Sequence, residues 1–116
     1  MVANSKLHFF RGSWIADYPD AENYLSLFYS KNFSPNGPNY THFYDPNYDK
    51  LYEQALSETN DSLRALLYQR MDQLIIENAV VVPLYYDRVL RFTRKNISGF
   101  SSNAMNLLNL KTTKKD

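Results

Sequence analysis

An acidic side chain between two large aromatic side chains is the feature of this sequence that most clearly suggests chemistry. Asp17 follows Trp14 and Ala16 and precedes Tyr18 in the stretch WIADYPD. A carboxylate beside aromatic faces suits a ligand with a cationic head group, because the acid pairs with an ammonium group while the rings cover its apolar surroundings. The spacing favours these four residues as a ligand-binding loop. An aspartate that only stabilises its own loop is the alternative that spacing leaves open.

Two further acids, Asp20 and Glu22, lie close enough to Asp17 in the sequence to suggest an acid and base pair of the glycosidase kind. Such a pair requires two carboxyl groups about 5 to 10 Å apart across an open cleft. Both residues, however, stand at the start of a predicted helix, where acids are favoured by unpaired amide groups and by the helix dipole. We therefore expect Asp20 and Glu22 to be structural, and a glycosidase-like enzyme is the less favoured alternative.

Other catalytic and metal-binding patterns are missing from the sequence. It has no cysteine and two histidines, His8 and His42, and it has no nucleophile-elbow or phosphate-loop motif. His42 stands among aromatic residues rather than at metal-ligand spacing, and with Tyr40 it could line a ligand cleft. We predict a protein that is not an enzyme and that uses no metal and no cofactor.

The ligand-binding loop is expected to lie between a strand and a short helix. The run LHFFRGSW at residues 7–14 predicts a buried strand that ends at a glycine and a serine. Asp20 can cap a helix that stops near Ser30. Residues 31–45 are rich in proline, glycine and asparagine, which is typical of a loop.

Two longer helices are expected next. Asp45 before Pro46 is a strong helix start, because a capping carboxylate precedes a proline at the first helical position, and this helix should end before Asn60. Asn60 or Asp61 then caps the longest helix, whose apolar side chains are spaced by three and four residues and predict a stripe facing the core. The stripe consists of Leu63, Leu66, Leu67, Met71, Leu74, Ile75 and Ala79.

The rest of the chain predicts strands. The β-branched run VVVPLYY at residues 80–86 and a second run at 89–93 are typical of strands, with Pro83 at an edge or a bulge. Residues 96–99 predict a turn, and LLNL at 107–110 predicts a short apolar strand. The order of elements predicts an α/β chain in which helices flank a small mixed sheet.

The composition fits one small globular domain, with 116 residues of which 44% are hydrophobic. Thirteen basic and twelve acidic side chains give a net charge of +1 and are mostly interspersed, so nucleic acid is not an expected partner. The aromatic content of 16% exceeds what a core of this size buries, so some rings should line a cleft or pack against structure outside the chain. No stretch approaches a membrane span or a signal peptide, so any membrane anchor is expected outside this chain.

Four ordered segments resemble the C-terminal region of the family 5 solute-binding proteins, the dipeptide and oligopeptide receptors of ABC importers. The segments are WIADYPDAENYLSLFYS, NYTHFYDPNYDKLYEQAL, LYQRMDQLIIENAVVVPLYYDRVLRF and NLLNLK, between about Phe9 and Lys111. The resemblance implies a protein that is periplasmic or at the extracellular face of the membrane and is often lipid-anchored. It also implies a type II periplasmic-binding-protein fold, in which two lobes close over a peptide that is then delivered to ABC permease subunits.

The resemblance assigns roles as well. In peptide-binding relatives the acid of a Trp-x-Ala-Asp pattern pairs with the peptide's α-amino group, and the matching residues are Trp14, Ala16 and Asp17. Residues 1–87 would belong to the second lobe and carry the ligand-facing loop, and residues 88–116 would cross the hinge and return toward the first lobe. Strand edges in that return segment would lack their native sheet, so self-association is expected. Relatives that carry nickel chelates, haem or sugars, and sensory peptide receptors, are open alternatives.

Overall fold

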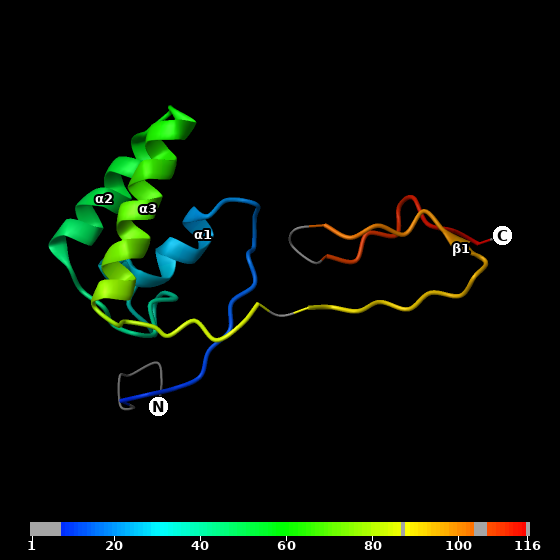
Figure 1. Cartoon of the computed structure of the whole chain (residues 1–116), viewed down its shortest axis with the longest axis horizontal. Helices are drawn as coiled ribbons and strands as arrows, with labels where there is room; N and C mark the ends of the chain where they lie inside the picture. Colours follow the sequence, from blue (N-terminus) through cyan, green and yellow to red (C-terminus); the bar gives the residue numbers. More distant parts are fainter. Residues whose placement is uncertain (1–7, 87, 104–106, 116) are drawn as a thin grey trace.

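The chain is divided into a helical body and an extended arm (Figure 1). The computed structural model describes residues 8–86, 88–103 and 107–115. Every helix within those ranges lies in the body, and the arm, which begins at residue 88, runs out to a small sheet far from the helices. The principal dimensions of 57 × 39 × 25 Å reflect this extension. Asp87, where the expected division at residues 87 and 88 falls, lies outside the described residues.

The helices of the body begin where capping chemistry predicts. Asp45 accepts hydrogen bonds from the backbone amides of Asn47 and Tyr48 at 2.7 and 3.1 Å. The Asn60 side chain accepts from the amides of the second and third residues of its helix at 3.0 and 3.2 Å. Both predicted caps are confirmed, because each side chain satisfies two amides that have no intrahelical partner. The helices are α1 (Glu22–Leu25), α2 (Pro46–Ser57) and α3 (Asp61–Glu77), with 3-10 turns at Ser26–Phe28 and Ser30–Asn32.

The core lies between α2, α3 and the segment that contains α1. Tyr48 and Met71 are fully buried at its centre, and the Tyr48 hydroxyl donates a hydrogen bond to the Leu25 carbonyl at 2.7 Å. The polar end of this buried tyrosine is therefore satisfied. The buried hydrophobic residues are Leu25, Tyr29, Tyr48, Tyr52, Ala55, Met71 and Ile75. None of the described helices is long and apolar enough to cross a membrane.

The predicted apolar stripe of α3 belongs only partly to the core. Met71 and Ile75 are buried, but Leu63 and Leu66 are 50% and 51% exposed. These two leucines lie in the first turns of α3, where they line an open surface hollow beside α2 instead of packing under another element. Ala79 leaves the stripe because it follows the end of α3 with a positive φ of 50°.

Most predicted strands are not formed in the described part of the chain. The sheet that is present pairs β1 (Ile97–Ser98) with β2 (Lys114–Lys115) in antiparallel register. A strand is stable only when its backbone groups pair with a neighbour, and the other extended segments have none here. Helix and strand both occur, as predicted, but the sheet is not mixed and the helices do not flank it (Figure 1). The predicted strands that are absent lie at residues 8–14, 80–86, 89–93 and 107–110.

The turn that precedes the sheet is shifted from its predicted position. The Ile97 amide donates to the Arg94 carbonyl at 3.0 Å and closes a turn over residues 94–97, and Ser98 belongs to β1, where it pairs with Lys114. Gly99 has a φ of 71°, and a Cβ at this position would lie 2.1 Å from the Thr112 carbonyl oxygen. A glycine is therefore required where the two sides of the hairpin approach each other.

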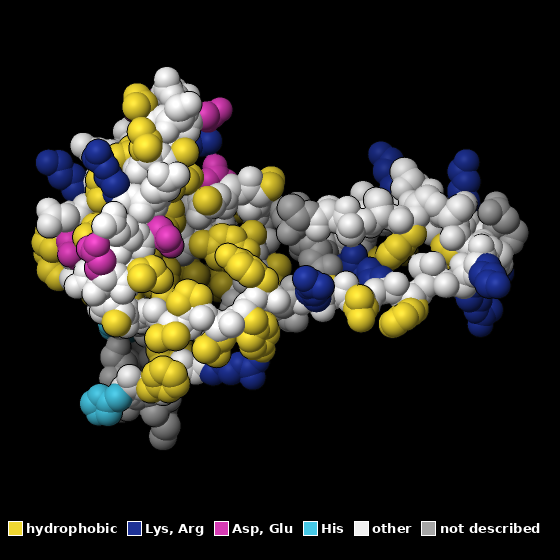
Figure 2. Space-filling model, viewed as in Figure 1, with side chains coloured by type: hydrophobic (Ala, Val, Ile, Leu, Met, Phe, Trp, Pro, Cys, Tyr) yellow, Lys and Arg dark blue, Asp and Glu magenta, His cyan; other side chains and the backbone are white. Residues whose placement is uncertain are grey.

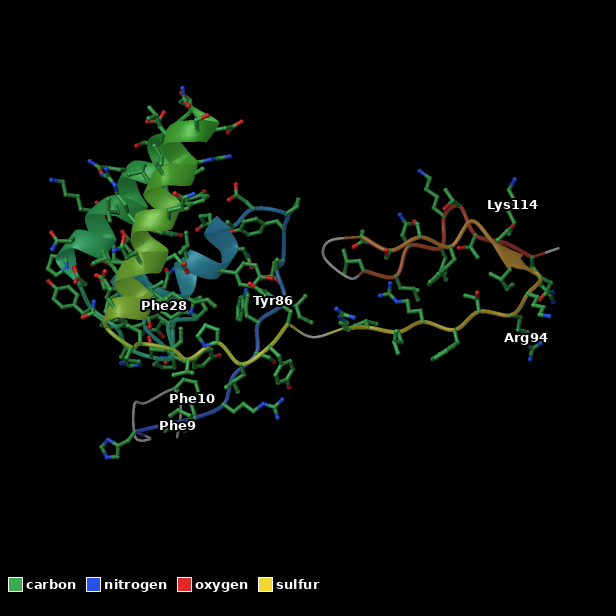
Figure 3. The ribbon with its side chains drawn as sticks, in the orientation of Figure 1. Phe9, Phe10, Phe28, Tyr86, Arg94 and Lys114 are labelled. Carbon is green, nitrogen blue, oxygen red and sulfur yellow. The ribbon has the colours of Figure 1, made fainter. Side chains whose placement is uncertain are left out.

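The segment that leads to the arm, and the arm itself, expose large apolar side chains. Tyr86 is 100% exposed and Phe92 is 92% exposed, and Figure 3 shows Arg94 and Lys114 at the far end of the arm. Figure 2 shows basic side chains along the arm and acidic side chains over the body. The arm thus presents apolar and basic groups to solvent.

The Tyr48 hydroxyl can be tested by replacing Tyr48 with Phe, which keeps the ring and leaves the Leu25 carbonyl without its buried donor. We expect the free energy of unfolding to fall by about 1 to 2 kcal/mol, measured by urea denaturation followed by circular dichroism. Tyr44→Phe is the matched control, because Tyr44 is 65% exposed, and it should change stability by less than about 0.5 kcal/mol. Equal effects of the two changes would contradict the role of this hydrogen bond.

Candidate functional site

The predicted ligand-binding loop lies directly before α1 and is held by one side chain of that helix. Asn23 is 3% exposed, and its Oδ1 accepts hydrogen bonds from Trp14 Nε1 at 2.7 Å and from the Asp17 backbone amide at 3.2 Å. The structure therefore brings Trp14 and Asp17 together around one buried amide, while the Tyr18 hydroxyl is hydrogen-bonded to Glu22.

Asp17 is fixed through its backbone while its side chain stays accessible. The residue is exposed, and no hydrogen bond or ion pair of its carboxylate occurs with the residues that the structure describes. Trp14 and Ala16 are half-buried and Tyr18 is 42% exposed. This arrangement leaves a carboxylate available to an external cation, with an aromatic residue on either side of it in sequence.

Asp20 holds the start of α1 in place. Its Oδ1 accepts hydrogen bonds from the Glu22 amide at 2.9 Å and from the Tyr68 hydroxyl at 3.0 Å, and its Oδ2 lies 3.6 Å from Arg64 Nη1. Burial, and then the bond to Asp20, raise the pKa of the Tyr68 hydroxyl to about 12, so that hydroxyl remains a donor at neutral pH. A carboxylate engaged on all these sides is not a general acid or base, so Asp20 is not half of a glycosidase pair.

Glu22 is likewise committed to the protein's own hydroxyl groups. Its carboxylate accepts hydrogen bonds from Tyr18 and from Tyr52, which lies in α2. The pKa of Tyr52 is raised, first by burial and then by the bond to Glu22, and the pKa of Tyr18 is raised chiefly by its bond to Glu22. Both phenols stay protonated and donate, so Glu22 ties the ligand-binding loop to α2 and does not act on a ligand.

Tyr40 and His42 lie in the loop between the 3-10 turns and α2. His42 Nε2 is 3.0 Å from Ser34 Oγ, and its ring stacks on Phe33 with centroids 5.0 Å apart. Its positive φ of 54° fixes it in a tight part of that loop. Tyr40 is 44% exposed. His42 has a local structural role, and the proposed cleft-lining role of these two residues stays a prediction.

The described residues offer no other candidate site. They contain no group of three or more His, Asp or Glu side chains placed to hold a metal ion. Open hollows lie between α2 and α3, one of them lined in part by Leu63, Leu66 and Arg70. None of the predicted ligand-binding residues lines these hollows.

Sequence reasoning missed Asn23, the residue that organises the loop. In the stretch AENYL it reads as a polar position on a helix surface, because nothing local shows that it is buried. Two signals were present. Asparagine is a weak helix former that competes with the backbone for hydrogen bonds, and a nearby Trp carries an indole N–H that needs an acceptor once it is covered.

Comparison with known proteins identifies a set of binding proteins of one kind. No family model matches the chain. The probable deoxycholate-binding periplasmic protein YgiS of Escherichia coli is 31% identical over 78% of this chain and 16% of that protein. The periplasmic oligopeptide-binding protein OppA of Salmonella typhimurium is 28% identical over 78% of the chain and 16% of that protein. The dipeptide-binding protein DppE of Bacillus subtilis is 25% identical over 96% of the chain and 20% of that protein.

The similarity extends over most of this chain but over a small part of each relative. The chain spans 16% to 20% of the length of these three proteins. Further relatives that are named as di/tripeptide- and oligopeptide-binding proteins confirm the family resemblance that the four ordered segments predicted. The chain is therefore homologous to one segment of the family 5 solute-binding proteins.

Proposed function

We propose that this chain is the ligand-facing part of a solute-binding protein that captures peptides and delivers them to the permease of an ABC importer. The proposal places it in the periplasm or at the extracellular face of the membrane. The observation that carries it is the accessible carboxylate of Asp17, which has no partner among the described residues and lies on a loop whose backbone is held by a buried side chain. Relatives named as oligopeptide- and dipeptide-binding proteins support the peptide class.

In this proposal Asp17 is the counter-charge for the α-amino group of a peptide. Trp14 and Tyr18 cover the apolar atoms around that ammonium group, and Ala16 leaves room for the peptide backbone. The contact becomes selective when a second lobe, outside this chain, closes and removes water, because an unpaired carboxylate is then costly. Residues 88–116 would cross between the lobes. Binding and lobe closure are the whole of the chemistry, and no covalent step is involved.

A non-peptide solute is the second candidate, and one relative favours it. YgiS is named as a probable deoxycholate-binding protein, and deoxycholate is an anion without an amine. An accessible Asp17 carboxylate would repel such a ligand, so peptide and bile acid predict opposite effects of removing this charge. A sensory receptor that binds peptides would share the peptide chemistry and differ only in its partner.

The amine-pairing role is tested by titrating trialanine, N-acetyl-trialanine and deoxycholate into the ¹⁵N-labelled chain and following amide shifts by NMR, which detects weak binding. We expect free trialanine to bind at least about tenfold more tightly than the acetylated peptide, the factor that one charge-assisted hydrogen bond supplies. Asp17→Asn should abolish this preference. Asp72→Asn, which neutralises another exposed acid, should preserve it.

Two results would count against the peptide proposal. Equal binding of both peptides to wild type and to Asp17→Asn would remove the amine-pairing role. Tighter binding of deoxycholate than of trialanine, increased further by Asp17→Asn, would favour the non-peptide solute.

Self-association of this chain is also proposed, and the distribution of charge supports it. Residues 88–115 carry seven basic and no acidic side chains, whereas residues 8–86 carry ten acidic and five basic ones. The arm also exposes Leu90, Phe92 and Leu108 at 78%, 92% and 62%. A basic, apolar arm of one copy is complementary to the acidic body of another.

Light scattering after size-exclusion chromatography should therefore show a dimer or larger species at about 0.1 M salt. About 0.5 M salt should shift the population toward monomer, because exposed charges are then screened. Replacing both Leu90 and Phe92 by Ser should have the same effect at low salt by removing exposed apolar area. A monomer at high protein concentration and low salt would refute the proposal.

A further inference from the structure

We propose that Asn23 is a positioning residue, which holds the Asp17 loop in one conformation and thereby sets the preference for ligands with a free amino group. The inference rests on the proposed peptide-binding function for its consequence but not for its geometry. Asn23 touches no ligand in this scheme. It acts on the ligand through Trp14 and Asp17.

The geometry of Asn23 is that of a two-point clamp. Its Oδ1 receives the Trp14 indole N–H at 2.7 Å and the Asp17 amide at 3.2 Å. The Asn23 side chain is 3% exposed, and its oxygen accepts two hydrogen bonds at once. It therefore fixes the loop on both sides of Ala16. The Trp14 ring and the acid are therefore held at one separation.

Asn23 is itself fixed to the core, so the loop takes its position from the helices. Its backbone amide donates to the Asp20 carbonyl at 3.2 Å, and its carbonyl accepts from the Ser26 hydroxyl at 2.9 Å. Asp20 is bonded to Tyr68 of α3 at 3.0 Å. A shift of Asn23 would require these bonds to move together, which gives the clamp its rigidity.

The chemistry of the contacts explains why asparagine suits this position. Serine is too short to reach the indole and the Asp17 amide together. Aspartate keeps the acceptor, but it places another negative charge beside Glu22. Asparagine supplies an acceptor with two lone pairs without adding charge.

This clamp determines specificity through preorganisation. An Asp17 carboxylate on a mobile loop loses entropy when it meets an ammonium group, and this cost reduces the gain from the ion pair. With the backbone fixed, the same pair forms without that loss. Removing the clamp should therefore weaken binding of free peptides and leave acetylated peptides, which do not use the carboxylate, nearly unchanged.

The experiment compares wild type with Asn23→Ala and Asn23→Asp, with Asn60→Ala as the matched control. Asn60 also accepts two N–H groups through its side-chain oxygen, but both belong to α3, and none of its hydrogen bonds with the described residues reaches Trp14, Asp17 or Tyr18 of the loop. Hydrogen exchange of the Trp14 indole and the Asp17 amide is measured by NMR without ligand, and thermal unfolding is recorded for each protein. Trialanine and N-acetyl-trialanine are then titrated.

In Asn23→Ala we expect the Trp14 indole proton and the Asp17 amide proton to exchange about tenfold faster, which is the factor for one lost hydrogen bond to a buried partner. The roughly tenfold preference for the free peptide over the acetylated peptide should fall toward one. Asn23→Asp, which keeps the acceptor, should restore slow exchange. Asn60→Ala should lower thermal stability while loop exchange and peptide preference stay as in wild type. If Asn23→Ala does not fold, the same measurements are made on Asn23→Ser, for which the same faster exchange and the same loss of preference are expected.

Unchanged exchange of the Trp14 indole and the Asp17 amide in Asn23→Ala would overturn the clamp, whatever the peptides do. An equal increase in exchange in Asn60→Ala would also overturn it, because the loop would then report only global stability. A wild-type protein that binds free and acetylated trialanine equally would refute amine pairing, and the preference for a free amino group with it. The exchange data would still decide whether Asn23 holds the loop.

Discussion

Hydrogen bonds from buried or half-buried tyrosine hydroxyls to the segment around α1 are the interactions on which the rest of the body depends. Tyr48 reaches the Leu25 carbonyl, Tyr52 reaches the Glu22 carboxylate and Tyr68 reaches the Asp20 carboxylate. α1 itself is only four residues long, which is too short for a helix to be stable on its own. The tyrosines of α2 and α3 supply the stability that its length cannot.

This constraint separates the three acids that look alike in sequence. Asp20 and Glu22 satisfy the donors that α2 and α3 direct at α1, and removing either would leave a half-buried or buried hydroxyl without its acceptor. Asp17 receives no such donor to its carboxylate among the residues described. The acid without a structural partner is the one that can serve a ligand, and this difference arises from packing and not from residue type. It also explains why the acid pair of a glycosidase is not formed.

The parts of the fold that were predictable are those governed by neighbours in sequence. The caps at Asp45 and Asn60 involve residues two and three positions away, so the pattern alone located the starts of α2 and α3. Strands depend on partners distant in the sequence or outside the chain, and the runs at residues 80–86 and 89–93 remain extended without pairing. The burial of Asn23 also depends on tertiary packing. The sequence pattern alone therefore did not identify Asn23 as the residue that holds the loop.

The ligand-binding loop and the arm differ in how much each needs the rest of a solute-binding protein. The loop is completed by contacts that lie within the body, from Asn23 to the tyrosines of α2 and α3, so its conformation does not require a second lobe. In the arm, by contrast, large apolar side chains such as Leu90, Phe92 and Leu108 are left mostly in water. Under the proposed function, a lobe that closes over this ordered loop would only have to exclude water and strengthen the ion pair with the ligand. Specificity for the amino group would then be set in this segment, while affinity and ligand length would be set by the lobe that closes over it.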